Sequence, residues 1–175
     1  LDNASGTAAL IELARAFKSL KQKPERTIVM LAVTAEEQGL LGSEYYANNP
    51  IYPVEKTVAN INMDVVNSFG KTLDMSIIGE GQSEIEDLAK QELEKDGRYA
   101  APDPKPEAGS YYRSDHFNFA KKGIPILFFY DGMLKSDYHK PTDTIEKINW
   151  NLKKKRTRMI FHTAWEMANR DAMLK

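Results

Sequence analysis

Apolar residues recur along this chain with two different periods, and together these predict alternating strands and helices. Residues 27–33 form an uncharged apolar run rich in β-branched side chains, which is typical of a buried strand. Residues 84–95 carry apolar side chains at helical spacing, and residues 124–130 form a second apolar run. Because strands and helices alternate, we predict an α/β fold: a three-layer α/β/α sandwich with a largely parallel, mixed sheet.

The same patterns set the bounds of the predicted elements. Ser5 is predicted to cap the first helix, because a serine hydroxyl can accept from a free backbone N–H of the first turn. The predicted helices cover 5–20, 39–48, 84–95, 116–122 and 150–170. The predicted strands cover 27–33, 58–63, 73–78 and 124–130. The predicted loops are 97–113, which contains three prolines, and 136–144.

Size and composition narrow the classes of protein. With 175 residues, of which 42% are hydrophobic and 28% charged, residues 1–175 are predicted to form one soluble domain with a single core. The formal net charge of -1 offers no field of one sign, so nucleic acid is not a predicted partner. The basic run 153–156 is interpreted as a solvated helical face. No apolar run is long enough to span a membrane, and the absence of cysteine excludes disulfides and thiolate ligands.

Acids and one imidazole follow the predicted strands or stand in loops. Glu36 and Glu37 come just after the run 27–33, and Asp64 follows the second predicted strand. Asp2 and His139 complete the set. Carboxylate and imidazole groups suit zinc and similar ions. Since neighbouring side chains in extended backbone point in different directions, one glutamate could hold a metal while the other handles a proton.

Each of these residues also has a plain structural interpretation when taken alone. Glu36 and Glu37 could be a solvated loop pair, and Asp2 could be an acid at the start of a helix. Asp64 could be an exposed acid at a strand end, and His139 could be a surface histidine. The sequence patterns alone leave these alternatives open.

Five segments, in this order, resemble the M28 family of zinc aminopeptidases. The Thr-Ala-Glu-Glu-Gln-Gly-Leu-Leu-Gly-Ser segment at 34–43 is the most specific of them, and Asp-Asn-Ala-Ser-Gly before a helix is also specific. The resemblance implies a zinc-exopeptidase-like fold and a metal-dependent hydrolase. The segments are 2–9, 34–43, 60–64, 113–116 and 138–143.

The resemblance also implies roles for the metal-binding residues. Asp2 corresponds to a carboxylate that bridges two zinc ions, and Glu37 and His139 correspond to the other ligands of one ion. Asp64 corresponds to a ligand of the second ion. Glu36 corresponds to the general base that later returns its proton as a general acid.

Further residues, in the matching segments or just before one of them, are expected near the substrate. Tyr138 corresponds to a tyrosine that, in some members, hydrogen-bonds the oxyanion. Tyr111 and Tyr112 are expected to line the substrate pocket, with coverage of the core as the alternative. The remaining residues of this group lie in a segment close to the site: Ser114, Asp115 and His116.

This chain departs from the family pattern at one point. Family members carry a His-x-Asp motif upstream of the Asp-Asn-Ala-Ser-Gly segment, and its histidine is a ligand of the second metal. The three histidines of this chain, at 116, 139 and 162, do not fit that motif. We therefore expect an N-terminally truncated part of a larger catalytic domain, which binds one zinc ion or none where the intact domain binds two. An edge left uncovered by the absent segment is expected to promote self-association.

The expected activity is release of N-terminal amino acids from peptides that have a free N-terminus. Three alternatives remain: a related metallo-carboxypeptidase, an enzyme like glutaminyl cyclase, or a non-catalytic binding module of the same fold. Secretion or export to the periplasm is expected, because many relatives are exported.

Overall fold

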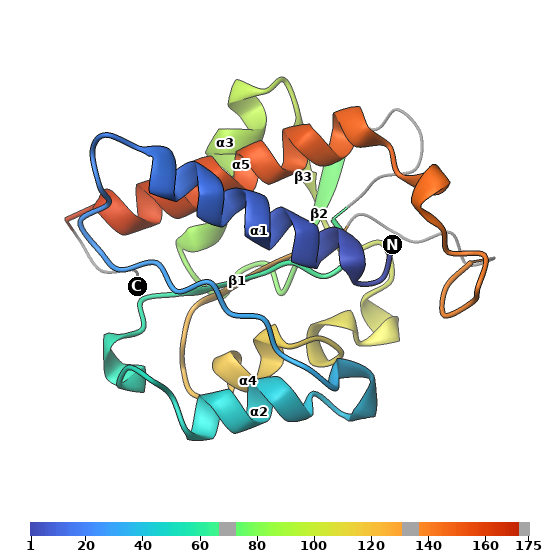
Figure 1. Cartoon of the computed structure of the whole chain (residues 1–175), viewed down its shortest axis with the longest axis horizontal. Helices are drawn as coiled ribbons and strands as arrows, with labels where there is room; N and C mark the ends of the chain where they lie inside the picture. Colours follow the sequence, from blue (N-terminus) through green and yellow to red (C-terminus); the bar gives the residue numbers. More distant parts are fainter. Residues whose placement is uncertain (67–72, 131–136, 172–175) are drawn as a thin grey trace.

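A mixed β-sheet lies between two layers of helices (Figure 1). The computed structural model describes residues 1–66, 73–130 and 137–171. One face of the sheet is covered by α1, α3 and α5, and the other by α2 and α4, so the predicted three-layer α/β/α architecture is confirmed. The helices are α1 (Ala4–Ser19), α2 (Leu41–Asn48), α3 (Ile85–Lys95), α4 (His116–Ala120) and α5 (Trp150–Asn169). The strands are β1 (Asn60–Asn62), β2 (Asp74–Ile78), β3 (Tyr99–Ala101) and β4 (Ile126–Tyr130).

The strand order in the described part of the sheet is β1-β4-β2-β3. Strand β1 runs parallel to β4, with Asn60 opposite Ile126. Strands β2 and β3 are also parallel to each other, whereas β2 and β4 are antiparallel, with Ile77 opposite Phe129. This single antiparallel pairing makes the sheet mixed, as predicted.

The larger part of the core lies between the sheet and the layer of α1, α3 and α5. Leu127 of β4 and Ile77 of β2 are almost fully buried there, together with Leu13 of α1 and Ile160 of α5. A smaller cluster on the opposite face contains Phe119 of α4. None of the helices that the structure describes combines the length and the apolar character needed to cross a lipid bilayer.

Most predicted helices and strands are confirmed to within a few residues, but the predicted helix cap is wrong. The N-cap of α1 is Asn3, whose side-chain oxygen accepts a hydrogen bond from the N–H of Gly6 at 3.0 Å. Ser5 is a buried residue of the first turn instead. Both residue types cap helices well, so the sequence did not distinguish the two positions.

The predicted strand at 27–33 is wrong as a hydrogen-bonded strand. Burial alternates over 27–30 and over 31–33, but the neighbours Met30 and Leu31 are both partly buried: Met30 packs against the larger core cluster and Leu31 against the smaller one. Both sides of an extended chain are therefore used, as in a strand. Within the part of the chain that the structure describes, however, no backbone hydrogen bond involves residues 27–33. The flanking bonds are those from the Gly42 N–H to the Thr34 carbonyl and from the Arg26 N–H to the Ala168 carbonyl.

Two further expectations need correction. The predicted loop 97–113 contains the short strand β3, which exists because it pairs with β2, a partner more than twenty residues away in sequence. The basic run 153–156 is not wholly solvated, because Lys153 and Arg156 are buried. The Lys153 ammonium donates to the carbonyl of Ser5, and so joins α5 to the first turn of α1.

Replacing Leu127 by alanine should lower the free energy of unfolding by about 2–5 kcal/mol, because the side chain is fully buried in the central strand β4 and its loss leaves a cavity. Leu73→Ala is the matched control: that leucine is 60% exposed, so the expected change is within about 0.5 kcal/mol. Urea unfolding followed by circular dichroism measures both. Equal costs for the two variants would contradict this description of the core.

Candidate metal centre

The N-cap of α1 ties the start of this helix to the segment that follows β1. The side-chain oxygen of Asn3 accepts from the N–H of Gly6 at 3.0 Å and from the N–H of Val65 at 3.1 Å. Its amide nitrogen donates to the carbonyl of Met63 at 3.0 Å. One side chain therefore fixes the position of Asp2, its neighbour, relative to the end of β1.

Close approach between these two segments requires a glycine at position 6. A Cβ atom at Gly6 would lie 2.1 Å from the Met63 carbonyl oxygen and 2.4 Å from the Asn3 side-chain oxygen, which backbone packing does not allow. Asp64 follows Met63 directly. The absence of a side chain at Gly6 thus allows Asp2 and Asp64 to approach the same region from two segments.

Glu36 and Glu37 open a short 3-10 turn, η1 (Glu36–Gln38). The turn follows Ala35 and is followed by Gly39 and Leu40, and all three take left-handed backbone conformations, although Ala35 (φ of 58°) and Leu40 (φ of 61°) are not glycines. Such conformations are uncommon and cost energy in residues with a Cβ. The turn reverses the chain between the extended segment 27–33 and α2, so both glutamates project from a tight corner.

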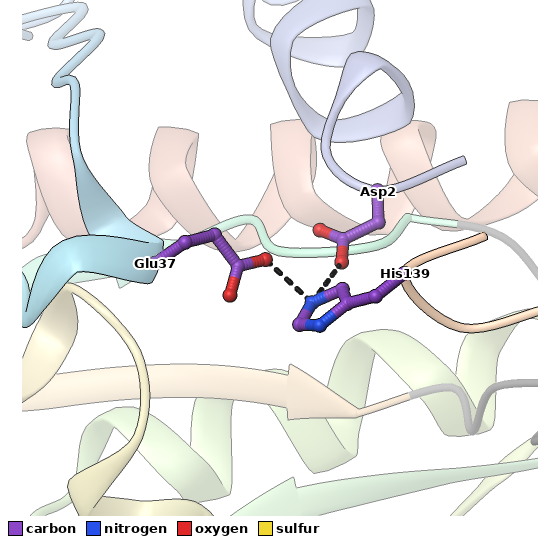
Figure 2. A group of neighbouring side chains, drawn as sticks. All are labelled: Asp2, Glu37 and His139. Atoms are coloured by element: carbon purple, nitrogen blue, oxygen red, sulfur yellow. Dashed lines mark ion pairs between the residues drawn. The ribbon is translucent and has the colours of Figure 1, made fainter. Parts of the chain in front are cut away.

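His139 meets the carboxylates of Asp2 and Glu37 (Figure 2). Its Nε2 lies 2.5 Å from Glu37 Oε1 and 3.3 Å from Asp2 Oδ2, and one ligand atom from each of the three residues lies within 4.8 Å of the others. The three residues come from the start of α1, from η1 and from the loop after β4. In Figure 2 both carboxylates point at the same imidazole nitrogen.

Asp143 holds the histidine loop against the start of α1. Its Oδ2 accepts a hydrogen bond from the backbone N–H of Asp2 at 2.9 Å. Asp143 therefore links the segment that contains His139 to the residue whose carboxylate that imidazole meets. This contact joins positions that are 141 residues apart in the chain.

Asp64 lies outside this group of three but interacts with it electrostatically. The hydroxyl of Ser114 donates to Asp64 Oδ2 at 2.7 Å, and the amide of Asn62 donates to that hydroxyl at 2.8 Å. The pKa of Asp64 is raised to about 6: burial raises it most, the Ser114 hydrogen bond lowers it, and the negative charges of Asp2, Asp115 and Glu37 raise it. The carboxylate is thus oriented by a serine and destabilised by its acidic neighbours.

Glu36 has a pKa close to neutral. Burial raises its pKa to about 7, with further upward contributions from the charges of Asp64, Glu37 and Asp115. The pKa of Asp2 is raised in the same direction, first by burial and then by Glu37, while His139 opposes the change. A pKa near neutral is what a general base needs at physiological pH.

Tyr138 lies beside the group of three. Its ring centroid is 3.7 Å from that of His139. Burial and the charges of Glu37 and Asp2 raise the pKa of its phenol. The hydroxyl therefore stays protonated at neutral pH and can act as a hydrogen-bond donor.

The tyrosines expected to line a substrate pocket occupy different environments. The Tyr111 hydroxyl donates to the Gln82 side chain at 2.6 Å, and its ring lies so close to Gly79 that a Cβ there would be 2.6 Å away. Tyr112 is 63% exposed. Its ring packs edge-on against those of Tyr111 and Phe117.

His116 and Asp115 both point into the protein rather than toward solvent. His116 is fully buried and stacks on Phe128 at 4.5 Å, and burial lowers its pKa to about 4, so the imidazole is neutral. Burial raises the pKa of Asp115, while a hydrogen bond with Ser43 acts in the opposite direction. Contact of these residues with substrate stays a prediction.

Sequence reasoning missed the side chains that orient the site. Three of them lie inside segments that resemble the M28 pattern: Asn3, Asn62 and Asp143. Asp143 accepts from the backbone of Asp2, Asn3 donates to the residue before Asp64, and Asn62 donates to the serine that holds Asp64. Their position within those segments was the available signal. What it did not reveal was the partner of each side chain.

Three comparisons describe what this chain is similar to. Aminopeptidase YwaD of Bacillus subtilis is 32% identical over 157 residues, which are 85% of this chain and 33% of that protein. The solved structure of an aminopeptidase from Aneurinibacillus sp. strain AM-1 matches with a TM-score of 0.76 and 29% identity, over 98% of this chain and 40% of the other. The structure of BSAP, a zinc aminopeptidase from Bacillus subtilis, matches with a TM-score of 0.78 and 25% identity, over 98% and 43%.

This chain therefore spans between a third and a half of the length of these relatives. The model of peptidase family M28 matches residues 1–164, which is nearly the whole chain. The five segments that resemble that family all lie within the matched range. The chain belongs to peptidase family M28.

Proposed function

We propose that the protein containing this chain is a metal-dependent aminopeptidase that hydrolyses the N-terminal peptide bond of peptides. The observation that carries the proposal is the approach of Asp2, Glu37 and His139 to one another, with ligand atoms within 4.8 Å. Two carboxylate oxygens and one imidazole nitrogen, with a fourth position left for water, are a donor set typical of catalytic zinc.

The electrostatics of the site fit a bound cation. Asp2, Glu36 and Asp64 all have raised pKa values, in part because each lies near other negative charges. A divalent ion would relieve this repulsion and favour the ionised carboxylates. Zn²⁺ bound here would polarise the scissile carbonyl and lower the pKa of a water molecule toward ~7.

Individual residues of the chain would then have different roles in the hydrolysis. Glu36 would accept a proton at its carboxylate and return it to the leaving amine, a contribution typically worth ~10²–10⁴-fold. Tyr138 would donate its phenolic hydrogen to the developing oxyanion. Asp64, held by Ser114, would serve a second ion, and the acidic surroundings would favour the ammonium of a free N-terminus.

Replacing Glu36 by glutamine should lower kcat by about 10²-fold or more, because the amide cannot accept the proton. Zinc affinity should stay close to that of the wild-type protein, since Glu36 is not one of the three converging residues. The rate of leucine release from a leucyl amide measures kcat, and competition with a chelator measures zinc affinity. Glu44→Gln, an exposed acid on α2, is the control and should change neither quantity.

A panel of substrates separates the proposal from its alternatives. A carboxypeptidase cleaves peptides with a blocked N-terminus, and a cyclase converts an N-terminal glutamine without releasing a residue. A binding module cleaves nothing. Metal-dependent cleavage of blocked peptides, or a wild-type protein that neither binds zinc nor cleaves unblocked peptides, would overturn the proposal.

The metal-free protein should become less stable as the pH rises from about 4 to about 7. The pKa values of Asp64 (about 6) and Glu36 (about 7) in the folded state exceed their ordinary values of 3.8 and 4.5. At pH values between the ordinary and the raised pKa of each group, the folded state therefore binds more protons than the unfolded state. This contribution to stability is complete below about pH 4 and is lost as pH rises through the folded pKa values. Urea unfolding in the presence of chelator, at a series of pH values, measures it.

Glu36→Gln supplies the control for this pH dependence. The variant lacks the group with the higher pKa, so the fall in stability between about pH 6 and pH 7 should shrink, while the fall below about pH 6, to which Asp64 contributes, remains. An unchanged profile in the variant would mean that Glu36 titrates normally in the folded protein.

We also infer that this chain self-associates through residues 27–33. The proposal is supported by a seven-residue run without charge or proline and by backbone groups that form no bond to the described backbone. A second copy could satisfy these groups by strand pairing. Sedimentation velocity of wild-type protein over a range of concentrations should reveal dimers or larger species.

Val29→Lys should shift this equilibrium toward monomer, because Val29 is 44% exposed and a lysine on an open strand opposes pairing. Ile11→Lys is the matched control, since Ile11 is 52% exposed but lies on α1. A wild-type chain that sediments as a monomer at every concentration would refute the inference.

A further inference from the structure

Helix α4 contacts the start of α2 through buried polar side chains that none of the proposed roles explains. Asn118 of α4 is 2% exposed and Ser43 of α2 is fully buried. The Asn118 amide nitrogen donates to Ser43 Oγ at 2.8 Å and to the Leu40 carbonyl at 3.1 Å. Ser43 Oγ also donates to the Leu40 carbonyl at 3.1 Å, so the three groups form one network, which the Asp115 carboxyl joins through its hydrogen bond with Ser43.

Both side chains of the network donate to Leu40, a residue that is hydrogen-bonded to the turn containing Glu36 and Glu37. Leu40 has a left-handed backbone with φ of 61°, and its N–H donates to the Glu36 carbonyl at 2.8 Å. Ala35, at the other end of the turn, is also left-handed. A left-handed residue with a Cβ costs about 1–2 kcal/mol, so this corner needs contacts that hold it in place.

Cohesion between the two helices has a separate apolar source. Tyr46 of α2 lies 6.0 Å from Phe119 of α4, ring centroid to ring centroid, and Ala47 of α2 is buried. The packing of α2 against α4 therefore does not depend mainly on the polar network. Its specific effect is to fix one carbonyl, that of Leu40, in the turn that follows Glu36 and Glu37.

We propose that Asn118 is a positioning residue: acting with Ser43 on the Leu40 carbonyl, it fixes the turn that presents Glu36 and Glu37 to the metal centre. Ser114, at the other end of the same segment, holds Asp64. Residues 114–118 therefore set the spacing between the glutamate turn and the second acid. The role in catalysis rests on the proposed function, but the effect on the turn does not.

The first test needs neither metal nor substrate. In the metal-free chain, Asn118→Leu combined with Ser43→Ala should speed hydrogen exchange of the backbone amides of residues 38–42 several-fold, while amides of α1 and α5 keep their rates. The Leu40 carbonyl and the Asp115 carboxyl each lose a hydrogen bond, so the free energy of unfolding should also fall, and the test is the loss of protection in the turn relative to α1 and α5. Hydrogen–deuterium exchange by mass spectrometry and urea unfolding measure the two effects.

The second test is zinc affinity, measured by competition with a chelator. Misplacement of Glu37 should weaken binding by about tenfold, the lower end of the range for groups that orient ligands. The single variant Asn118→Leu, which keeps Ser43, should bind zinc as weakly as the double variant. It still lacks the side-chain amide that donates to the Leu40 carbonyl. If either variant that carries Asn118→Leu fails to fold, the single variant Ser43→Ala tests the proposal. It should show a smaller loss of zinc affinity in the same direction.

Asn49→Leu is the matched control. Its amide nitrogen donates to the carbonyl of Tyr45 at 3.1 Å, at the opposite end of α2 and on the surface. It should alter neither exchange in the turn nor zinc affinity. Exchange and affinity equal to wild type in the variants at 118 and 43 would overturn the proposal. If the wild-type protein that contains this chain binds no zinc, the proposed function is overturned, and hydrogen exchange in the turn still tests the role of Asn118.

Discussion

Repulsion between carboxylates is the constraint on which this site depends. Burial is the largest cause of the raised pKa values of Asp2, Glu36 and Asp64, and the negative charge of Glu37 raises all three. A polypeptide left to relax would move such groups apart, since ionised acids in a partly buried site are costly. The fold prevents this with short contacts to rigid elements, and the stored repulsion then favours binding of a cation at the same place.

The two adjacent glutamates illustrate how backbone geometry separates roles. Glu37 lies in contact with the imidazole of His139, whereas the pKa of Glu36 responds most, after burial, to Asp64. A 3-10 turn directs neighbouring side chains to different sides. One residue can therefore face a metal ligand while its neighbour keeps a raised pKa suited to proton transfer.

The sequence predicted the elements whose signal is local. Helix α5 and strand β4 have long or strongly apolar patterns, and both are where the periodicity indicates. Strand β3 is three residues long and depends on pairing with β2, which no local pattern can reveal. The segment 27–33 has the composition of a strand, but hydrogen bonding in a sheet is a property of two segments and not of one.

The same distinction applies to the site. The candidate ligands could be named because their segments resemble the M28 pattern. The partners that orient them could not, because the bonds from Asn62 to Ser114 and from Ser114 to Asp64 join residues about fifty positions apart. A motif states which side chain is present, while the fold decides which neighbour it meets.

Helix α5 connects these contacts to the end of the chain. The buried ammonium of Lys153 donates to the carbonyl of Ser5, in the turn that directly follows Asp2 and its neighbour Asn3. At the far end of α5, the guanidinium of Arg26 donates to the carbonyl of Met167 at 3.1 Å, just before the extended segment 27–33. The helix thus holds both the start of α1, which carries Asp2, and the start of the segment that leads to Glu36 and Glu37. Carboxylates that repel each other stay close only if the segments that carry them are held rigidly. Helix α5 therefore contributes to the geometry of the site, although it supplies none of the site residues.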